Sequence, residues 1–229
     1  MKSCTALRSI MLGLAVLVAC VSCKPSFMNK GLAAHYLSRG NTSGGQVVAA
    51  SPAVDRLGNA GYAYNFNGSN SCITFKSVPL TQIDNWTLAV WIKPAVTVQH
   101  AMVVCLGFDD GNKGDGIELG LSDWPYYPGD HLYGLLGGVK WVDSGYAFPM
   151  ADMWYHVVML RRDGVLRFYV NGVQTPNTET LNPLKPTAFT IGSGTGARFF
   201  NGVINDVRIY KRALSDAEVQ QLYNYEKAR

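Results

Sequence analysis

Short runs in which apolar and polar residues alternate recur along most of the chain, with glycine or asparagine between many of them. Residues 154–170 are the clearest case, because Asp163-Gly164 supplies a turn between two such runs. On the return run one face carries Leu166, Phe168 and Val170, and the other carries Arg167 and Tyr169. This period of two predicts a β-hairpin with one buried face. Its register should be firm, since a one-residue slip would expose the apolar side chains.

Several other segments predict strands. Residues 62–66 and 72–76 flank an Asn-Gly-containing turn and have the pattern of a second hairpin. Residues 86–92 alternate, and residues 101–106 form a continuous apolar run that suits a central strand. The spacing of these runs and turns predicts roughly a dozen strands, which is typical of a β-sandwich.

One helix is predicted, at the end of the chain. Ser215 and Glu218 have the spacing of a capping box, and Val219, Leu222 and Tyr223 follow at helical spacing. We expect this helix to pack on an edge of the sandwich. The predicted fold class is therefore all-β: a two-sheet antiparallel sandwich with a short C-terminal helix.

The N-terminus has a different character from the rest of the chain. Lys2 and Arg8 precede an apolar run over residues 10–19, which is too short to span a bilayer and has the length of a signal-peptide core. The run ends in Leu17-Val18-Ala19-Cys20, which resembles the lipobox of bacterial lipoproteins. In those proteins the cysteine is acylated and begins the mature chain. An ordinary secretory signal that happens to contain a cysteine is the alternative.

These features predict how the chain is organised. Residues 1–19 are expected to form a lipoprotein signal peptide, and residues 20–30 a tether lipidated at Cys20. We find no internal linker or repeat, so residues 31–229 are expected to form a single sandwich domain. The predicted location is the cell envelope, as an exported lipoprotein anchored at the outer membrane.

Composition narrows the classes of partner. Apolar residues make up 48% of the chain and charged residues 16%, as in a globular protein. Removing residues 1–19 takes away two basic residues and no acid, so the formal net charge of +4 falls by two. The chain has no basic run, so nucleic acid is not expected as a partner. Of the remaining cysteines, Cys72 and Cys105 are either bridged or, as their apolar surroundings favour, buried thiols.

Five blocks of sequence, taken in order, carry a family resemblance. They are residues 55–68, 86–94, 154–158, 166–172 and 200–215. Together they resemble the laminin-G-like, concanavalin A-like lectin/glucanase jelly-roll domains of secreted bacterial proteins. The resemblance implies two antiparallel sheets of about six strands each, one of them concave, which agrees with the strand pattern.

The resemblance also implies a structural calcium ion held by aspartates. The matching positions here are Asn67, Asn205 and Asp206, so two of three expected carboxylates are amides. Calcium gains affinity from ligand charge, and this set should bind it weakly. The alternative is that Asn67 belongs to a turn and Asp206 pairs with a neighbouring arginine.

An aromatic loop is the candidate ligand-binding site. Its expected contact residues are Asp123, Trp124, Tyr126 and Tyr127, and Tyr133 and Trp141 are expected to extend the surface. Flat aromatic rings beside carboxylates suit stacking on sugars and hydrogen bonding to hydroxyls. The alternative is that these rings cap the core of the sandwich.

Catalysis is not expected. Glucanases of this fold place carboxylates on one face of a strand, whereas Glu118 and Asp123 are an odd number of residues apart and would face opposite ways. The sequence therefore predicts a non-catalytic module that binds carbohydrate or a surface macromolecule. A protein-interaction or adhesion module is the alternative, and a glycoside hydrolase is a third hypothesis.

Overall fold

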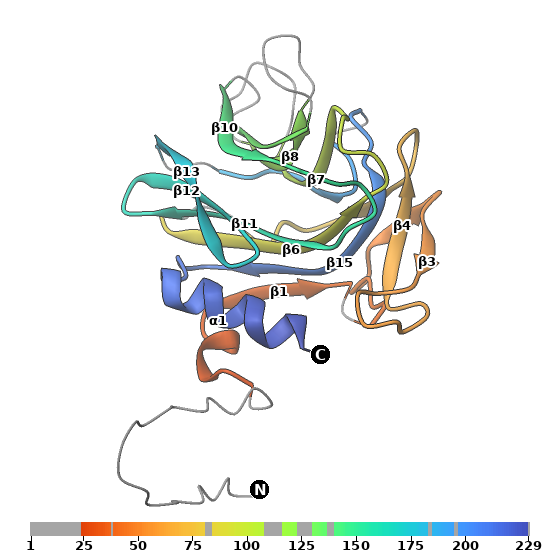
Figure 1. Cartoon of the computed structure of the whole chain (residues 1–229), viewed down its shortest axis with the longest axis horizontal. Coiled ribbons are helices and arrows are strands. Elements are labelled where there is room, and N and C mark those ends of the chain that lie inside the picture. The colour runs from red at the N-terminus through yellow and green to blue at the C-terminus, as the bar shows by residue number, and fades with distance from the viewer. Residues whose placement is uncertain are drawn as a thin grey trace, which may run out of the picture.

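The computed structural model describes residues 24–37, 39–80, 84–107, 116–122, 130–136, 140–182, 185–194 and 197–228. Two antiparallel sheets pack face to face, and one helix lies along the outside of one of them (Figure 1). The predicted all-β sandwich with a C-terminal helix is confirmed. The signal peptide over residues 1–19 and the lipidation at Cys20 lie outside the described residues.

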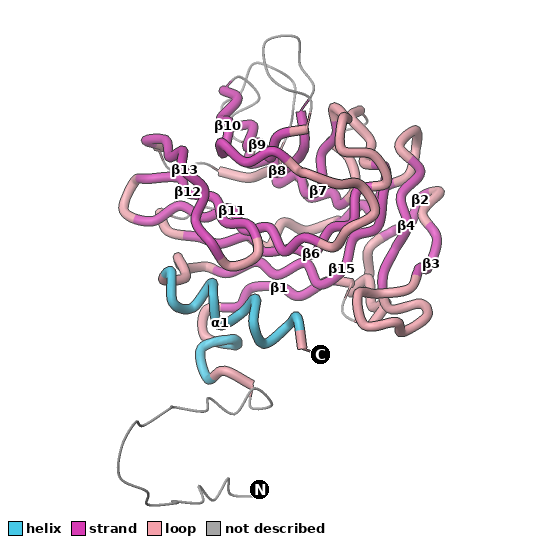
Figure 2. Tube along the Cα trace, viewed as in Figure 1, coloured by secondary structure: helices cyan, strands magenta, loops and turns pink. Residues whose placement is uncertain are grey.

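Strands dominate the tube drawn in Figure 2, and helices occur near the two ends of the described chain. The first part of the chain contains η1 (Ser26–Asn29), β1 (Leu32–Tyr36), β2 (Gln46–Val48), β3 (Ser51–Ala53), β4 (Ala63–Asn67), β5 (Cys72–Phe75), β6 (Trp86–Pro94) and β7 (Ala101–Leu106). The second part contains β8 (Ile117–Ser122), β9 (His131–Leu136), β10 (Lys140–Ala147), β11 (Tyr155–Arg162), β12 (Val165–Val170), β13 (Val173–Thr180), β14 (Phe189–Ile191), β15 (Asn201–Tyr210) and α1 (Asp216–Lys227).

The two sheets differ in how their strands are ordered. The eight-stranded sheet runs β13-β12-β11-β6-β15-β4-β3, and β1 pairs with the distal half of β15. The seven-stranded sheet runs β10-β9-β8-β7-β14-β5-β2. Consecutive hairpins build one end of each sheet, and crossovers between the sheets build the other, as expected for a jelly roll.

The main core fills the space between the sheets. On β12, Leu166 and Phe168 are fully buried and belong to this core, whereas Arg167 stays partly exposed on the opposite face. The register predicted for the hairpin is confirmed, since Met159 on β11 lies opposite Phe168. Burying one alternate set of side chains on each sheet is what holds the layers together.

A second, smaller core lies outside the eight-stranded sheet, beneath α1. Val219 and Leu222 of the helix pack there on Ala89 of β6 and on Val158 and Leu160 of β11. The expectation that α1 would pack on an edge of the sandwich is therefore wrong, because the helix covers the middle of the sheet. The small or branched residues that face outward on β6 and β11 make room for it.

The capping box is confirmed: the Ser215 hydroxyl accepts from the Glu218 amide at 3.2 Å, and the Glu218 carboxylate accepts from the Ser215 amide at 2.9 Å. No helix within the described residues is both long and apolar enough to cross a membrane. Cys72 and Cys105 form no disulfide, and the Cys105 thiol donates to the Gly107 carbonyl at 3.1 Å. They belong to β5 and β7, which are separated by β14.

Candidate functional site

The outer face of the seven-stranded sheet carries polar and aromatic side chains from three neighbouring strands. On β8, Ile117, Leu119 and Leu121 point into the main core, so Glu118 and Ser122 face outward. The same alternation places His131 and Tyr133 of β9, and Trp141 and Asp143 of β10, on the outer face. The inner face of this sheet forms part of the core, so the polar and aromatic side chains on its outer face can contact a ligand.

Trp141 is the centre of this face. Its ring is half-buried, and the Arg198 guanidinium lies 5.4 Å from the ring centroid. The His100 ring is tilted against it with centroids 5.1 Å apart, and the Tyr133 ring meets it edge-on at 6.3 Å. We call His100, Tyr133, Trp141 and Arg198 the Trp141 cluster. The indole N–H of Trp141 donates no hydrogen bond to any described residue.

Two of the predicted ligand-binding residues are thus brought together, and their roles differ. Tyr133 is only 1% exposed, so it offers no free face and serves to fix the angle of Trp141. Trp141 keeps part of its ring open to solvent. The other predicted contacts, Asp123, Trp124, Tyr126 and Tyr127, lie outside the described residues.

Polar groups surround Trp141 within the same face. His131 Nδ1 lies 3.0 Å from Asp143 Oδ2, and Asp143 Oδ1 accepts from the Gly145 amide at 2.7 Å. His100 Nδ1 lies 3.3 Å from the Ser122 hydroxyl. Imidazoles, a carboxylate and a hydroxyl arranged around a flat ring can both donate to and accept from ligand hydroxyl groups.

Glu118 lies beneath this surface and is fully buried. The Arg198 guanidinium approaches one of its carboxylate oxygens at 3.4 Å. Burial raises the pKa of Glu118 to about 7, and the neighbouring Cys105 thiol only partly opposes that rise. Sequence reasoning missed this ion pair, because 80 residues separate its members and only a lone acid in an apolar strand signals it.

Comparison with known families identifies the fold. A laminin-G-like family model, described as the concanavalin A-like lectin/glucanases superfamily, matches residues 67–220, about two thirds of the chain. The chain belongs to this superfamily. The resemblance seen in the sequence is confirmed, although the model begins after the first of the five blocks has nearly ended.

Individual relatives of this superfamily member are distant. Domain 4 of AbnA, an extracellular arabinanase of Geobacillus stearothermophilus crystallised with arabinotriose, matches with a TM-score of 0.65 and 21% identity, covering 84% of this chain and 98% of that one. A putative carbohydrate binding protein of Bacteroides ovatus matches with a TM-score of 0.56 and 20% identity, covering 69% and 46%.

A curated relative, adhesion G-protein coupled receptor V1 of Danio rerio, is 29% identical over 166 residues, or 69% of this chain. The chain spans only 3% of the length of that receptor. The two solved structures show the shared fold, and the receptor is similar in sequence to this chain over a short segment of its own length.

The residues that match the superfamily's calcium positions do not come together. The Asn67 side chain closes its own turn, accepting from the Ser69 amide at 2.9 Å and the Ser71 hydroxyl at 3.0 Å. Along β15, Asn67 pairs with Asn201, four register positions from Asn205 and so roughly 13 Å away.

Asn205 and Asp206 instead surround an arginine. One nitrogen of the Arg56 guanidinium donates to both Asn205 Oδ1 and Asp206 Oδ2, the latter at 2.6 Å. The other two donate to the Glu226 carbonyl at 2.9 and 3.0 Å. The oxygens that would coordinate an ion already bind a side-chain cation, and these residues do not fit the implied calcium cage. The described residues also contain no cluster of three His, Cys, Asp or Glu that could hold a metal.

Asp206 is strongly held in its ionised form. Burial by itself would raise the pKa of this carboxyl group, but the hydrogen bond from His35 and the charges of Arg56 and Arg208 lower it to about 2. Its backbone is left-handed, with φ of 49°, at the bulge where β15 changes partners. This pairing of Asp206 with an arginine was the alternative that the sequence left open.

Proposed function

We propose that this protein is a non-catalytic carbohydrate-binding module whose ligand stacks on Trp141. The observation that carries the proposal is the environment of that ring: partly exposed, backed by the Arg198 cation, and with an indole N–H that no described residue accepts. Sugar rings have apolar faces that pack on aromatic rings and hydroxyls that need directional partners. Membership of the superfamily supports the proposal.

His100, Ser122, His131 and Asp143 are the proposed hydrogen-bonding partners of the sugar hydroxyls. Each is a side chain on the same outer face, and the His100–Ser122 and His131–Asp143 contacts are part-buried, which fixes the orientation of these groups. Pre-positioned polar groups lose little conformational entropy when a ligand binds. A binding mode with one aromatic platform and a few fixed polar groups matches the usual make-up of small-ligand sites.

Binding without hydrolysis is supported by the state of Glu118. Glycosidases place two carboxyl groups roughly 5–9.5 Å apart on either side of the scissile bond. Glu118 is fully buried and paired with Arg198, so it cannot approach a bond above the sheet. Asp143 on the same face is occupied by His131 and by the Gly145 amide.

Anchoring to a bacterial envelope is also proposed, on the basis of the lipobox that ends at Cys20. Acylation with more than one chain would hold the module firmly at a membrane, since each buried methylene contributes about 0.8 kcal/mol. Cys20→Ser should leave the expressed protein soluble and without lipid. If the variant partitioned into membranes as the wild type does, the assignment would be wrong.

An adhesion module is the second candidate. Two neighbouring loops expose apolar side chains: Val96 and Val98 are 43% and 64% exposed, and Met150 and Met153 are 55% and 47% exposed. The Asp152 amide ties one loop to Pro94 at the base of the other, at 2.7 Å. Contiguous apolar side chains of this kind favour a protein partner, and the match to an adhesion receptor supports that reading.

A glycan array followed by calorimetry tests the first proposal. Trp141→Ala should weaken every neutral glycan that the wild type binds by about fivefold to thirtyfold, because removing a stacking platform costs roughly 1–2 kcal/mol. Val173→Ala is the matched control, since Val173 is an exposed apolar residue outside the Trp141 cluster. Silence on the array, combined with a protein partner whose binding is lost on Met150→Ser, would replace the carbohydrate proposal with the adhesion one.

A further inference from the structure

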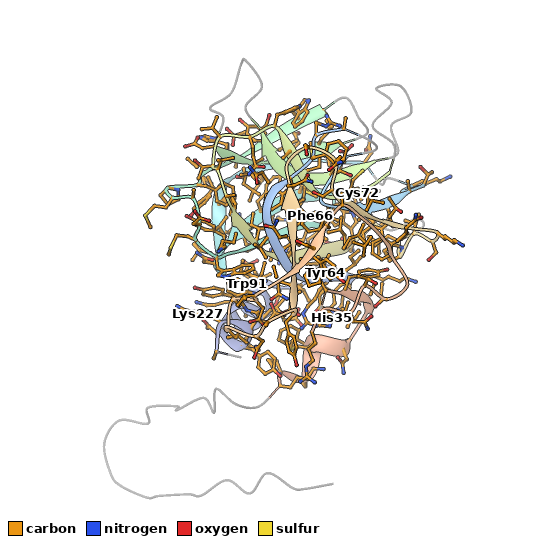
Figure 3. All side chains as sticks on the ribbon, turned by 90° about the vertical axis from the view of Figure 1, so that its right-hand side faces the viewer. His35, Tyr64, Phe66, Cys72, Trp91 and Lys227 are labelled. Atoms are coloured by element: carbon orange, nitrogen blue, oxygen red, sulfur yellow. The ribbon has the colours of Figure 1, made fainter. Side chains whose placement is uncertain are left out.

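A cavity of about 830 Å³ lies on the opposite side of the molecule from the Trp141 cluster, between the N-terminal segment, β1, the turn at residues 55–62 and the end of α1. In Figure 3, His35, Trp91 and Lys227 lie in the lower half of the molecule, at the level of β1 and α1. The volume is within the range of small-ligand sites, roughly 300–1,000 Å³. The walls come from five separate segments of the chain, so the cavity exists only in the folded domain.

Every acidic group in the cavity wall is already bound from within. Asp55 accepts from the backbone amides of Leu57 and Asn59, at 2.9 and 2.8 Å, and so closes its own turn. Asp206 accepts from His35 at 2.7 Å and from Arg56 at 2.6 Å. The third acid is the carboxylate of Glu226, which pairs with Arg208. Arginine therefore offsets the charges of Asp206 and Glu226, whereas Asp55 is held by neutral donors and keeps its charge.

The basic residues of the cavity wall outnumber its acidic residues. Lys24, Arg39, Arg56 and Arg208 face three acids, so the wall has an excess of positive charge even with His35 neutral. Arg39 is exposed and makes no hydrogen bond or ion pair with another described residue. Lys24 donates to the neutral Asn29 amide oxygen, at 2.9 Å, and pairs with no acid among the described residues. The uncompensated charge therefore sits on Arg39 and Lys24, which are the exposed basic residues of the wall.

An apolar surface lies in the same wall. Tyr62 and Leu57 are 37% and 42% exposed, which is high for large apolar side chains. The Tyr62 hydroxyl has no hydrogen-bond partner in the described part of the chain, whereas the Tyr62 backbone carbonyl accepts from the Asn205 side-chain amide at 2.8 Å. A fixed backbone with an open ring is a rigid platform for a ligand ring.

We propose that this cavity is a second binding site, which takes an acidic saccharide: a sugar ring bearing a carboxylate or a phosphate. Arg39 binds the anionic group, because guanidinium groups form paired, charge-assisted hydrogen bonds with both kinds of anion. Lys24 adds a second cation, and Tyr62 packs on the ring. The Asn205–Arg56–Asp206 network forms the rigid floor and gives no charge to the ligand.

Calorimetry on the mature chain tests the site with four acidic probes and their neutral counterparts. The probes are glucuronate, galacturonate, N-acetylneuraminate and glucose 6-phosphate, with glucose and galactose as the neutral sugars. At least one acidic probe should bind the wild type about tenfold or more tightly than its neutral counterpart. Acetate and inorganic phosphate should bind more weakly than the matching sugar, since they lack the ring. The carboxylate and phosphate arms show which anion the site prefers.

Matched variants locate the binding. Arg39→Gln should weaken the acidic probe by about tenfold, and Tyr62→Ala should weaken it by several fold. Lys185→Gln removes an exposed cation outside the cavity and should leave binding within about twofold. Trp141→Ala should also leave it unchanged. Because the Arg39 side chain is exposed and has no ion pair with a described residue, Arg39→Gln should melt within a degree or two of the wild type.

The proposal is overturned if acidic and neutral sugars bind alike, or if Arg39→Gln and Lys185→Gln have equal effects. Vesicles containing anionic phospholipid provide the remaining arm. If Arg39→Gln releases the protein from such vesicles while no acidic sugar binds the wild type, the surface is a membrane contact and the saccharide site does not exist.

Discussion

The two outer faces of the sandwich carry nearly the same aromatic arrangement in opposite states. Trp91, on the eight-stranded sheet, has the Arg56 guanidinium 4.7 Å from its ring centroid and the His156 ring at 5.2 Å. Trp141, on the seven-stranded sheet, has Arg198 at 5.4 Å and His100 at 5.1 Å. A tryptophan, an arginine and a histidine thus recur on both faces.

What differs is what covers the ring. Tyr223 of α1 stacks on Trp91 at 5.8 Å, and the Trp91 indole donates to Glu226 at 2.8 Å, so the ring is only 3% exposed. Trp141 keeps an open ring and an indole N–H with no acceptor among the described residues. Residue types alone therefore do not determine which face is available for binding. The two clusters are similar in composition, but α1 buries the one around Trp91.

The largest expected effect separates the two tryptophans. Trp91→Ala should lower the free energy of unfolding by about 3–5 kcal/mol, because it leaves a large cavity and removes the partner of Glu226. Trp141→Ala should cost about 1 kcal/mol or less. Urea unfolding of both variants measures the difference. Equal losses would mean that Trp141 is a structural residue as well.

The next effect is a stability change in acid that comes from the helix-covered face. Burial, with the charges of Arg56 and Arg208, lowers the pKa of His156 to about 3. The unfolded chain therefore binds a proton that the folded chain does not, and stability is lost as pH falls below about 6.5. His156→Gln should flatten the dependence of the melting temperature on pH between about 6.5 and 4. A slope unchanged by that substitution would contradict the assignment.

The open face should respond to pH in the opposite sense, and less strongly. Glu118 has its pKa raised to about 7, so the folded chain holds a proton that the unfolded chain releases above about 4.5. Its contribution is fully present below about pH 4.5 and is lost as pH rises through 7, up to roughly 3 kcal/mol. Glu118→Gln should abolish this loss, so that the variant does not lose stability as the pH rises from 5 to 8. Loss of stability with rising pH in that variant would point to another group.

The smallest expected effect is that of calcium. Because Arg56 occupies the oxygens of Asn205 and Asp206, we expect Ca²⁺ and EDTA to give the same melting temperature. Binding to the folded state alone would raise that temperature, so a shift that scales with ion concentration would revive the calcium hypothesis. Arg56→Gln provides the sharper comparison, since only a chain without the guanidinium leaves those oxygens open.

Local sequence patterns predicted most of the strands and the helix, but few of the contacts between segments that are distant in the sequence. The faces of residues 165–170 could be read because one side is core and the other is not. The position of α1 could not be predicted, because β6 is buried on both faces. A strand buried on both faces shows no alternation of polar and apolar residues, so its sequence does not indicate which element packs on its outer face.

The same limit applies to the candidate site. Tyr133 and Trp141 were found because both are aromatic residues that follow the aromatic loop closely in the sequence. Arg198 was not, since no local pattern shows that it lies beside β7, where its carbonyl accepts from the Met102 amide at 2.9 Å. Arg56 was missed for the same reason, because its partners Asn205 and Asp206 follow about 150 residues later.

The first and last described segments meet on one side of the molecule. Arg212 links them, donating to the Lys30 carbonyl at 2.7 Å and to the Glu218 carboxylate at 2.8 Å. The strands of the Trp141 cluster lie on the opposite side (Figure 1). Both ends of the described chain therefore lie on the side away from the Trp141 cluster. A membrane anchor or a further domain joined at either end would leave the Trp141 cluster accessible to a ligand.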